Sequence, residues 1–321
     1  LDCVPPDAPI SKIAQADNAS FIPSKQLYYP VDKRAALENK VVSRANDSLI
    51  VDRMEINLNK NYITKDELMI LDMIANNQWK RPIYFAITVG RDKYLNLQDY
   101  FQAEGFAYRL VPIKTTPVDD RIGRVETKVM YDNMVNKFTW GNMNKPDVYL
   151  DENNMRMSMN VRNNFVRLAD ALIDEGKADS AVAVLDRCNE LTPNEKVPYN
   201  YFNLLMADSY YRAARGKMNN MGIDTLRIEV NMNPSYVKKA NDVVKIMADN
   251  CEQELIYFFN LPPKFRDLVN DDLHRSFYIM RGLGRNGTSF GESELGDHIS
   301  KRLNNLMGNL QPETITPSSR Q

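Results

Sequence analysis

Residues 160–193 determine the fold expected for the second half of this 321-residue chain: NVRNNFVRLADALIDEGKADSAVAVLDRCNELTP. Apolar residues recur in this stretch at the i, i+3, i+4, i+7 spacing of an amphipathic helix. The first run is Phe165, Leu168, Ala169 and Leu172, and the second is Ala181, Val184, Leu185 and Cys188. Gly176 separates the runs and Pro193 follows the second, as helix-ending residues do. The stretch therefore predicts a helical hairpin.

Helical periodicity continues toward the C-terminus. A second hairpin matches less closely, through Met206, Ala207, Tyr210 and Ala214, and a long interval with the strand-like segment 226–230 follows it. Further helices are predicted at 236–259, 272–283 and 292–306. The polar tail after Gly308 is predicted to be disordered.

The part of the chain before residue 160 alternates between strand and helix patterns. Met54, Ile56 and Leu58 have the period of a half-buried strand. Thr64 and Glu67 form a capping box that starts a helix, whose expected buried stripe is Leu68, Leu71, Ile74 and Ala75. A buried strand at 83–89, a short helix at 97–104 capped by Gly105 and a strand at 106–113 follow. Such alternation predicts a mostly parallel sheet with right-handed crossovers.

The expected fold class is α+β, with a small α/β N-terminal layer followed by an all-α domain of helical hairpins similar to tetratricopeptide repeats. Four segments are predicted: an irregular N-terminal wrap at 1–48 with a short helix near 31–40, the α/β domain at 49–159 with a helix at 126–137, the helical domain at 160–307, and a tail at 308–321. Since the chain begins at Leu1 without a methionine, we expect an excised fragment or a processed product.

Composition excludes several classes of function. The 41 Lys and Arg residues balance 42 Asp and Glu residues, so no net field favours nucleic acid or an anionic membrane surface as the main partner. The longest apolar run, at 83–89, is far shorter than the roughly 20 residues that span a bilayer. Cys3, Cys188 and Cys251 are odd in number and widely spaced, so they predict no disulfide framework, and the last two are expected to be core residues.

No catalytic residue, cofactor site or metal site is predicted. His274 and His298 are too far apart for a local ligand pair, and the chain has no phosphate loop, dinucleotide fingerprint, Asp-x-Asp pair or Gly-x-Ser-x-Gly motif. The aspartates at 119–120 and 271–272 are adjacent in each pair, so they cannot face one substrate together. Gly90, at the end of a predicted strand, is interpreted as part of a structural turn.

The hairpin at 160–193 resembles a tetratricopeptide repeat almost position for position. Together with NQWKRPIYFA at 77–86 and EGFAYRLVP at 104–112, it resembles the C-terminal region of domain-of-unknown-function family 2723, over most of residues 20–300. Members of that family are large bacterial membrane proteins whose multi-spanning N-terminal part resembles protein O-mannosyltransferases of the lipid-linked-sugar class. The resemblance implies a membrane-anchored parent in a Gram-negative bacterium, with this chain on the periplasmic face and the transferase part absent from it.

The leading hypothesis is a non-enzymatic accessory domain that binds a protein or peptide partner, an acceptor polypeptide or the membrane part of its own parent. Two alternatives stay open. One is a carbohydrate-binding or carbohydrate-processing domain, because Trp79 and the many tyrosines can stack on sugar rings. The other is a purely structural cap.

The resemblance to tetratricopeptide arrays also suggests where a partner binds, because the first helix of each hairpin lines their concave surface. The residues expected there are Asn163, Val166, Asp170, Ile173, Tyr201, Leu204, Asp208, Tyr211 and Arg212. Tyrosine and arginine often anchor interfaces, whereas the acidic groups repel phosphate, so a peptide suits this surface better than a polyanion. The competing interpretation is that the surface is solvated or covered by residues 216–234.

Overall fold

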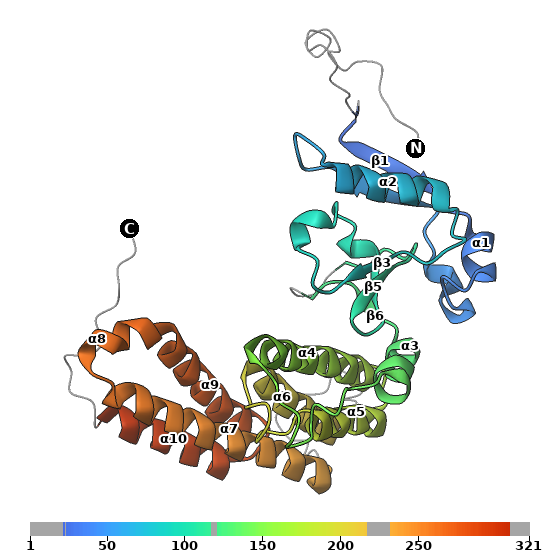
Figure 1. Cartoon of the computed structure of the whole chain (residues 1–321). Coiled ribbons are helices and arrows are strands. Elements are labelled where there is room, and N and C mark those ends of the chain that lie inside the picture. The colour runs from blue at the N-terminus through green and yellow to red at the C-terminus, as the bar shows by residue number, and fades with distance from the viewer. Residues whose placement is uncertain (1–21, 23, 117–120, 217–231, 309–321) are drawn as a thin grey trace. The chain divides into compact units, whose positions relative to one another are not determined.

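The computed structural model describes residue 22 and residues 24–116, 121–216 and 232–308 (Figure 1). The chain divides into two compact units, Leu1–Asn133 and Met134–Gln321, which are treated separately below. This division lies before the boundary expected at residue 160. The strand-like segment 226–230 and the predicted tail after Gly308 lie outside the described residues.

A two-stranded antiparallel sheet opens the first unit. Strand β1 (Gln26–Pro30) pairs with β2 (Arg53–Asn57), and α1 (Lys33–Glu38) and the 3-10 helix η2 (Arg44–Leu49) lie between them in the chain. Leu27 is paired with Ile56, and both side chains are buried. The strand at 54–58 and the short helix near 31–40 are thus confirmed. The irregular wrap expected at 1–48 is wrong for its second half, where residues 26–30 form a strand.

Helix α2 (Lys65–Asn77) begins where the capping box predicts. The Glu67 side chain accepts the backbone N–H of Thr64 at 3.0 Å, which satisfies a donor at the helix start. Leu71 and Ile74 are buried as expected, but Leu68 is 54% exposed. The apolar buried side of α2 is therefore formed by Leu71 and Ile74 and does not include Leu68.

The second sheet of the first unit has four strands in the order β3-β5-β4-β6. These are β3 (Tyr84–Ala86), β5 (Ala107–Leu110), β4 (Phe101–Ala103) and β6 (Arg124–Val125). The pairs β3/β5 and β4/β5 are antiparallel, and β4/β6 is parallel. The expected mostly parallel sheet is therefore wrong.

The cause lies in the segment 97–104, which was predicted to be a crossover helix. It contains the 3-10 turn η4 (Gln98–Tyr100), which leads directly into β4. Gly105, at φ 123°, lies in the short connection from β4 to β5 and is not a helix cap. Two strands joined by so short a connection run antiparallel, because a parallel pair needs a crossover of a dozen or more residues.

One face of this sheet is apolar. The rings of Phe85 and Phe101 lie 4.7 Å apart, Phe101 stacks on Tyr108 at 5.6 Å, and Tyr94 meets Phe101 edge-on at 5.1 Å. After β6 the chain forms α3 (Thr127–Tyr131), which continues into the π-helical turn η5 (Asp132–Lys137). The helix predicted at 126–137 is confirmed.

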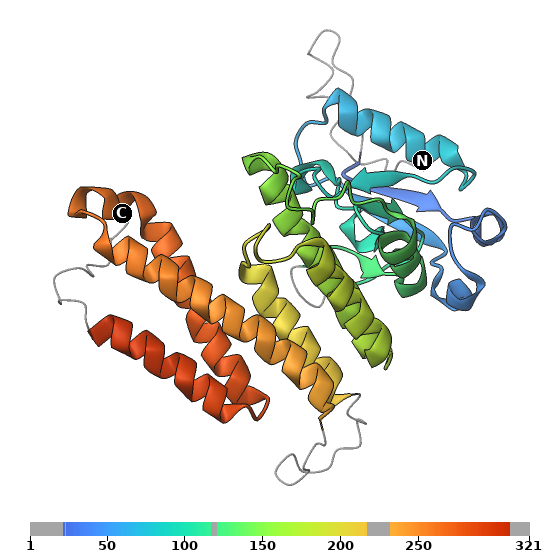
Figure 2. The same cartoon turned by 60° about the horizontal axis from the view of Figure 1, so that its bottom comes forward.

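The second unit is all-helical within its described residues (Figures 1 and 2). Its helices are α4 (Glu152–Asp174), α5 (Ala178–Leu191), α6 (Tyr201–Arg215), α7 (Pro234–Asn260), α8 (Pro263–Arg266), the 3-10 turn η6 (Asp267–Val269), α9 (Asn270–Ser289) and α10 (Ser293–Gly308). They pack as the pairs α4/α5, α6/α7 and α9/α10, and the first helix of each pair lies beside that of the next. The structure thus confirms a mixed α/β region followed by paired helices.

The predicted hairpin at 160–193 is the pair α4/α5. Phe165, Leu168, Ala181 and Leu185 are all fully buried, as the spacing predicts. Cys188 on α5 and Cys251 on α7 are also buried, whereas Cys3 lies outside the described residues. In the part of the chain that the structure describes, no helix combines the length and the apolar character needed to cross a membrane.

A buried cation ties α4 to the connection between α5 and α6. The guanidinium of Arg162 donates to Thr192 Oγ1 at 3.1 Å, to the Thr192 carbonyl at 2.9 Å, to the Pro198 carbonyl at 2.8 Å and to the Val197 carbonyl. Its charge is surrounded by carbonyl oxygens, and its face lies over the Tyr199 ring. Burial lowers the pKa of Arg162 to about 10, so the side chain is still protonated at neutral pH.

Candidate functional site

The nine residues predicted to line a partner-binding surface lie on α4 and α6, but most of them face the interior. Tyr201 is exposed, and Asn163, Asp208 and Arg212 are partly exposed. The other five are buried: Val166, Asp170, Ile173, Leu204 and Tyr211. These five side chains expose 8% of their surface or less, so the expectation that they lie on an open surface is wrong. Binding at the accessible four stays a prediction.

Helices α7 and α9 both pack against α6 and cover Leu204 and Tyr211. Gly282 of α9 lies so close to Leu204 that an added Cβ would be 2.8 Å from its Cδ2. The Tyr211 ring stacks on Phe290 at 4.9 Å. The Tyr211 hydroxyl donates a hydrogen bond to Asn241 Oδ1 of α7 at 2.5 Å. Burial raises the pKa of this hydroxyl. The expected covering segment, 216–234, lies mostly outside the described residues.

Asp170 and Arg212 bind each other across the two helices. Arg212 Nη1 donates to Asp170 Oδ1 at 2.8 Å, and its Nη2 donates to Asp174 at 2.9 Å. The Ser209 hydroxyl also donates to Asp170 Oδ1, at 2.7 Å. Asp170 and Arg212, which were expected to contact a partner, therefore form an ion pair that joins α4 to α6.

An accessible pair of aromatic side chains lies on α6 and α9, which are the first helices of their pairs. Tyr201, at the start of α6, is 38% exposed, and Tyr278 of α9 is 59% exposed. Their ring centroids are 6.2 Å apart. Sequence reasoning found Tyr201 but missed Tyr278, because only the packing of α9 beside α6 brings the two together. We call them the tyrosine pair.

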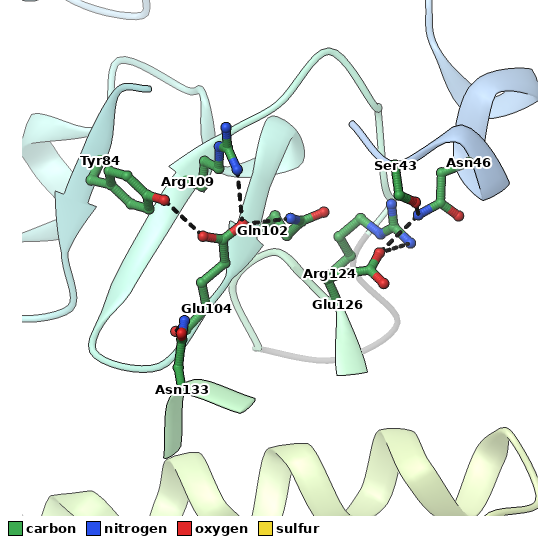
Figure 3. Close-up of polar contacts among 9 residues, drawn as sticks. All are labelled: Ser43, Asn46, Tyr84, Gln102, Glu104, Arg109, Arg124, Glu126 and Asn133. Atoms are coloured by element: carbon green, nitrogen blue, oxygen red, sulfur yellow. Dashed lines mark hydrogen bonds and ion pairs between the residues drawn. The ribbon is translucent and has the colours of Figure 1, made fainter. Parts of the chain in front are cut away.

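A second cluster lies on the polar face of the four-stranded sheet (Figure 3). The strand register places Tyr84 opposite Arg109, Arg109 opposite Gln102, and Gln102 opposite Arg124. Paired residues in neighbouring strands point to the same face of a sheet. The four side chains therefore form one row across all four strands, the polar row.

Glu104 lies at the centre of the contacts, two residues after Gln102 and on the same face. Its carboxylate accepts from the Tyr84 hydroxyl at 2.8 Å and from Gln102 Nε2 at 2.8 Å, and Arg109 Nη1 lies 3.6 Å away (Figure 3). Asn133 Nδ2 donates to the Glu104 backbone carbonyl at 2.8 Å. Glu104 is only 6% exposed, so this carboxylate is enclosed by its partners.

The other end of the row has its own carboxylate. Arg124 Nη2 lies 3.6 Å from Glu126, which also accepts from Asn46 Nδ2 at 2.8 Å (Figure 3). Two guanidinium nitrogens, Arg109 Nε and Arg124 Nη1, are buried without a hydrogen-bond acceptor. Charge is thus balanced along the row, while hydrogen bonding is incomplete. Buried donors without partners cost stability, so they mark places where a water or ligand oxygen would be favourable.

Tyr84 is the accessible member of the row. Burial of its hydroxyl and the bond to Glu104 raise its pKa, so the phenol is protonated at neutral pH and acts as a donor. The side chain is nonetheless 48% exposed. A half-exposed aromatic ring beside carboxylate, amide and guanidinium groups matches the chemistry of sugar hydroxyls and sugar rings. The sequence shows these residues only as polar positions in strands, without the register that aligns them.

Other residues considered for chemistry have structural surroundings. Trp79, expected as a possible sugar-stacking residue, is 3% exposed and lies 5.7 Å from the Tyr29 ring, so that expectation is wrong. Gly90 precedes the 3-10 turn η3 (Arg91–Lys93). His274 and His298 are exposed on α9 and α10. Among the described residues, no three His, Cys, Asp or Glu side chains are grouped as metal ligands.

The chain thus consists of two units. The first contains two small sheets, one of which carries the polar row, and the second consists of paired helices. Residues 2–129 match the family described as TMEM260-associated domain 2, a match over 128 of the 321 residues. TMEM260 is a membrane protein similar to O-mannosyltransferases. Comparison with curated proteins and with solved structures finds no match.

Proposed function

We propose that this chain is a non-enzymatic accessory region of a membrane glycosyltransferase-like protein, and that it binds a protein partner or an acceptor polypeptide. The observation that carries the proposal is the match of residues 2–129 to a TMEM260-associated domain. In this proposal the transferase chemistry belongs to a membrane part outside this chain. The chain itself lies on the periplasmic face of the cytoplasmic membrane of a Gram-negative bacterium.

The tyrosine pair supports the choice of a protein partner. Tyrosine combines a large apolar ring with a polar tip and loses little entropy when it is fixed, which is why it is enriched at interfaces. Tyr201 and Tyr278 come from neighbouring first helices and expose adjacent rings. The surface is therefore shifted toward α9, compared with the one expected from the resemblance to tetratricopeptide arrays.

The test replaces both members of the tyrosine pair by alanine. The purified chain is incubated with the membrane fraction, bound proteins are identified by mass spectrometry, and the binding of a purified candidate is then titrated. Loss of two interface anchors, at about 1 to 2 kcal/mol each, should weaken binding by about 30-fold or more. Tyr257→Ala is the matched control, because Tyr257 is 61% exposed on α7.

A titration unchanged in the double variant, with helicity intact by circular dichroism, would remove the tyrosine pair from the proposed interface. If no partner binds the unaltered chain at all, the structural-cap alternative replaces the proposal.

Carbohydrate binding is a second candidate, favoured by the half-exposed Tyr84 ring beside Glu104. A glycan array read with the whole chain tests it. Tyr84→Ala should abolish any signal, while Tyr84→Phe should retain part of it, since the ring remains and only the hydroxyl is lost. Equal signals from the unaltered chain and the Tyr84→Ala chain would refute this candidate.

A further inference from the structure

A cleft of about 370 Å³ lies between α9 and α10; neither tyrosine of the tyrosine pair lines it, and it lies in a different unit from the polar row. Its polar lining consists of Arg281, Arg285, Thr288, Ser289, Ser300 and Asn304. The remaining lining residues are apolar or glycine, so no carboxylate lines the cleft. This composition is unusual in a chain whose charges nearly cancel.

Glycines bring the two helices together beside the cleft. A Cβ at Gly287 would lie 3.0 Å from the backbone nitrogen of Gly296, and one at Gly284 would lie 2.8 Å from Ser300 Oγ. Side chains at these positions would push α10 away from α9. The close approach lets residues of both helices line one cleft.

The two arginines lack the carboxylate partners that their neighbours have. Arg275, on the same helix, pairs with Asp272 at 2.6 Å, and Arg302 of α10 pairs with Asp249 at 2.8 Å. Within residues 22–308, as far as the structure describes them, neither Arg281 nor Arg285 forms an ion pair, and both are exposed. Residues four apart on a helix are surface neighbours, so their guanidinium groups share one side of α9.

We propose that this cleft binds the phosphate group of a phosphate ester. A guanidinium offers paired N–H donors that match two phosphate oxygens, and two such groups one turn apart can hold a doubly charged anion. The hydroxyls of Thr288 and Ser300 donate to carbonyls of their own helices, at 3.1 and 2.9 Å, so the arginines supply the main donors. The cleft volume is in the range of small-molecule sites, which leaves room for the group that the phosphate carries.

Calorimetric titration of the whole chain at constant ionic strength tests the site. The soluble probes are inorganic phosphate and a hexose 1-phosphate, and flotation with phosphatidylcholine vesicles, with and without phosphatidic acid, tests a lipid phosphate. Arg281→Ala with Arg285→Ala should weaken binding by about tenfold or more per arginine, because hydrogen bonds to charged groups are the strong ones. Arg275→Ala, on the same helix but outside the lining, should leave binding unchanged.

Two further variants separate charge from geometry. Replacing both arginines by lysine keeps the charge and removes the planar fork, so binding should be intermediate. Asn304→Glu introduces a carboxylate into the lining and should abolish binding without removing either arginine.

Loss of binding to a soluble phosphate in the double-alanine variant supports the site. Binding to phosphatidic acid vesicles alone, lost in the same variant, also supports it and identifies a lipid as the phosphate source. No binding of any probe to the unaltered chain, or equal binding by the double-alanine variant, would overturn the proposal. Neither tyrosine of the tyrosine pair lines the cleft, and the two proposals are tested with different variants and different probes. Failure of the phosphate site therefore leaves the proposed partner-binding function untouched, and the reverse also holds.

Discussion

Replacing Arg162 by alanine should destabilise the helical unit more than any substitution of an exposed arginine on the same helix. The side chain is fully buried and donates to the carbonyls of Thr192, Val197 and Pro198 as well as to the Thr192 hydroxyl. These acceptors belong to the connection between α5 and α6. Arg162 therefore links α4 to the start of the next helix pair.

The magnitude follows from the groups left without a partner. Thr192 and Val197 are fully buried, and a buried polar group that loses its partner costs about 1 to 3 kcal/mol. Removing the long side chain also leaves a cavity. Burying the Arg162 guanidinium removes it from water, which costs free energy and also lowers its pKa. The alanine variant does not carry this cost, so part of the loss in stability is offset. We expect a loss of about 3 to 5 kcal/mol in the free energy of unfolding, a large share of the stability of a typical domain.

The two tryptophans let one unit be followed at a time. Trp140 lies in the helical unit, 5.4 Å from the Phe165 ring, and Trp79 lies in the first unit. In a Trp79→Phe background, urea unfolding followed by fluorescence reports on the helical unit alone. Arg156→Ala is the control, since Arg156 is an exposed α4 residue paired with Glu152, and its loss should cost less than about 0.5 kcal/mol.

A loss below about 1 kcal/mol for Arg162→Ala would refute this reasoning, because it would mean that water or repacking satisfies the carbonyls as well as the guanidinium does. Arg162→Lys helps to locate the cause. An ammonium keeps the charge but offers fewer donors in a different geometry, so we expect a loss between those of alanine and the unaltered chain.

Three further predictions follow from the same unit. Leu168→Ala should cost about 2 to 5 kcal/mol in the same unfolding assay, because Leu168 is fully buried between α4 and its neighbours, and an unchanged midpoint would contradict that packing. Burial raises the pKa values of Cys188 and Cys251 to about 12, so both thiols stay protonated and should react with iodoacetamide only after unfolding. Rapid labelling of the native protein at pH 8, detected by mass spectrometry, would contradict the burial of these thiols. Gly296→Ala should lower the melting temperature, at a cost of about 1 to 3 kcal/mol, since its Cβ would lie 2.7 Å from the Gly284 carbonyl, and a variant as stable as the unaltered chain would show that α10 can move away freely.

Local sequence patterns were sufficient for the long helices, although they wrongly predicted a helix at 97–104. The i, i+3, i+4, i+7 spacing located α4 and α5 and their buried residues, and the Thr64–Glu67 capping box located the start of α2. Both signals act between residues within two turns of each other. The mixed α/β region followed by paired helices was therefore accessible from the sequence alone.

Strand direction, and the burial of residues such as Leu204 and Tyr211 that were expected on a surface, were decided by tertiary structure. Phe101 lies in a strand because it packs against Phe85 and Tyr108, which come from other strands, although its local spacing also suits a helix. The polar row depends on the register of four strands, and the tyrosine pair depends on α9 lying beside α6. The spacing of residues within one segment does not show which distant segment it will pair with. Such contacts form only when the apolar faces of all the strands and helices pack together.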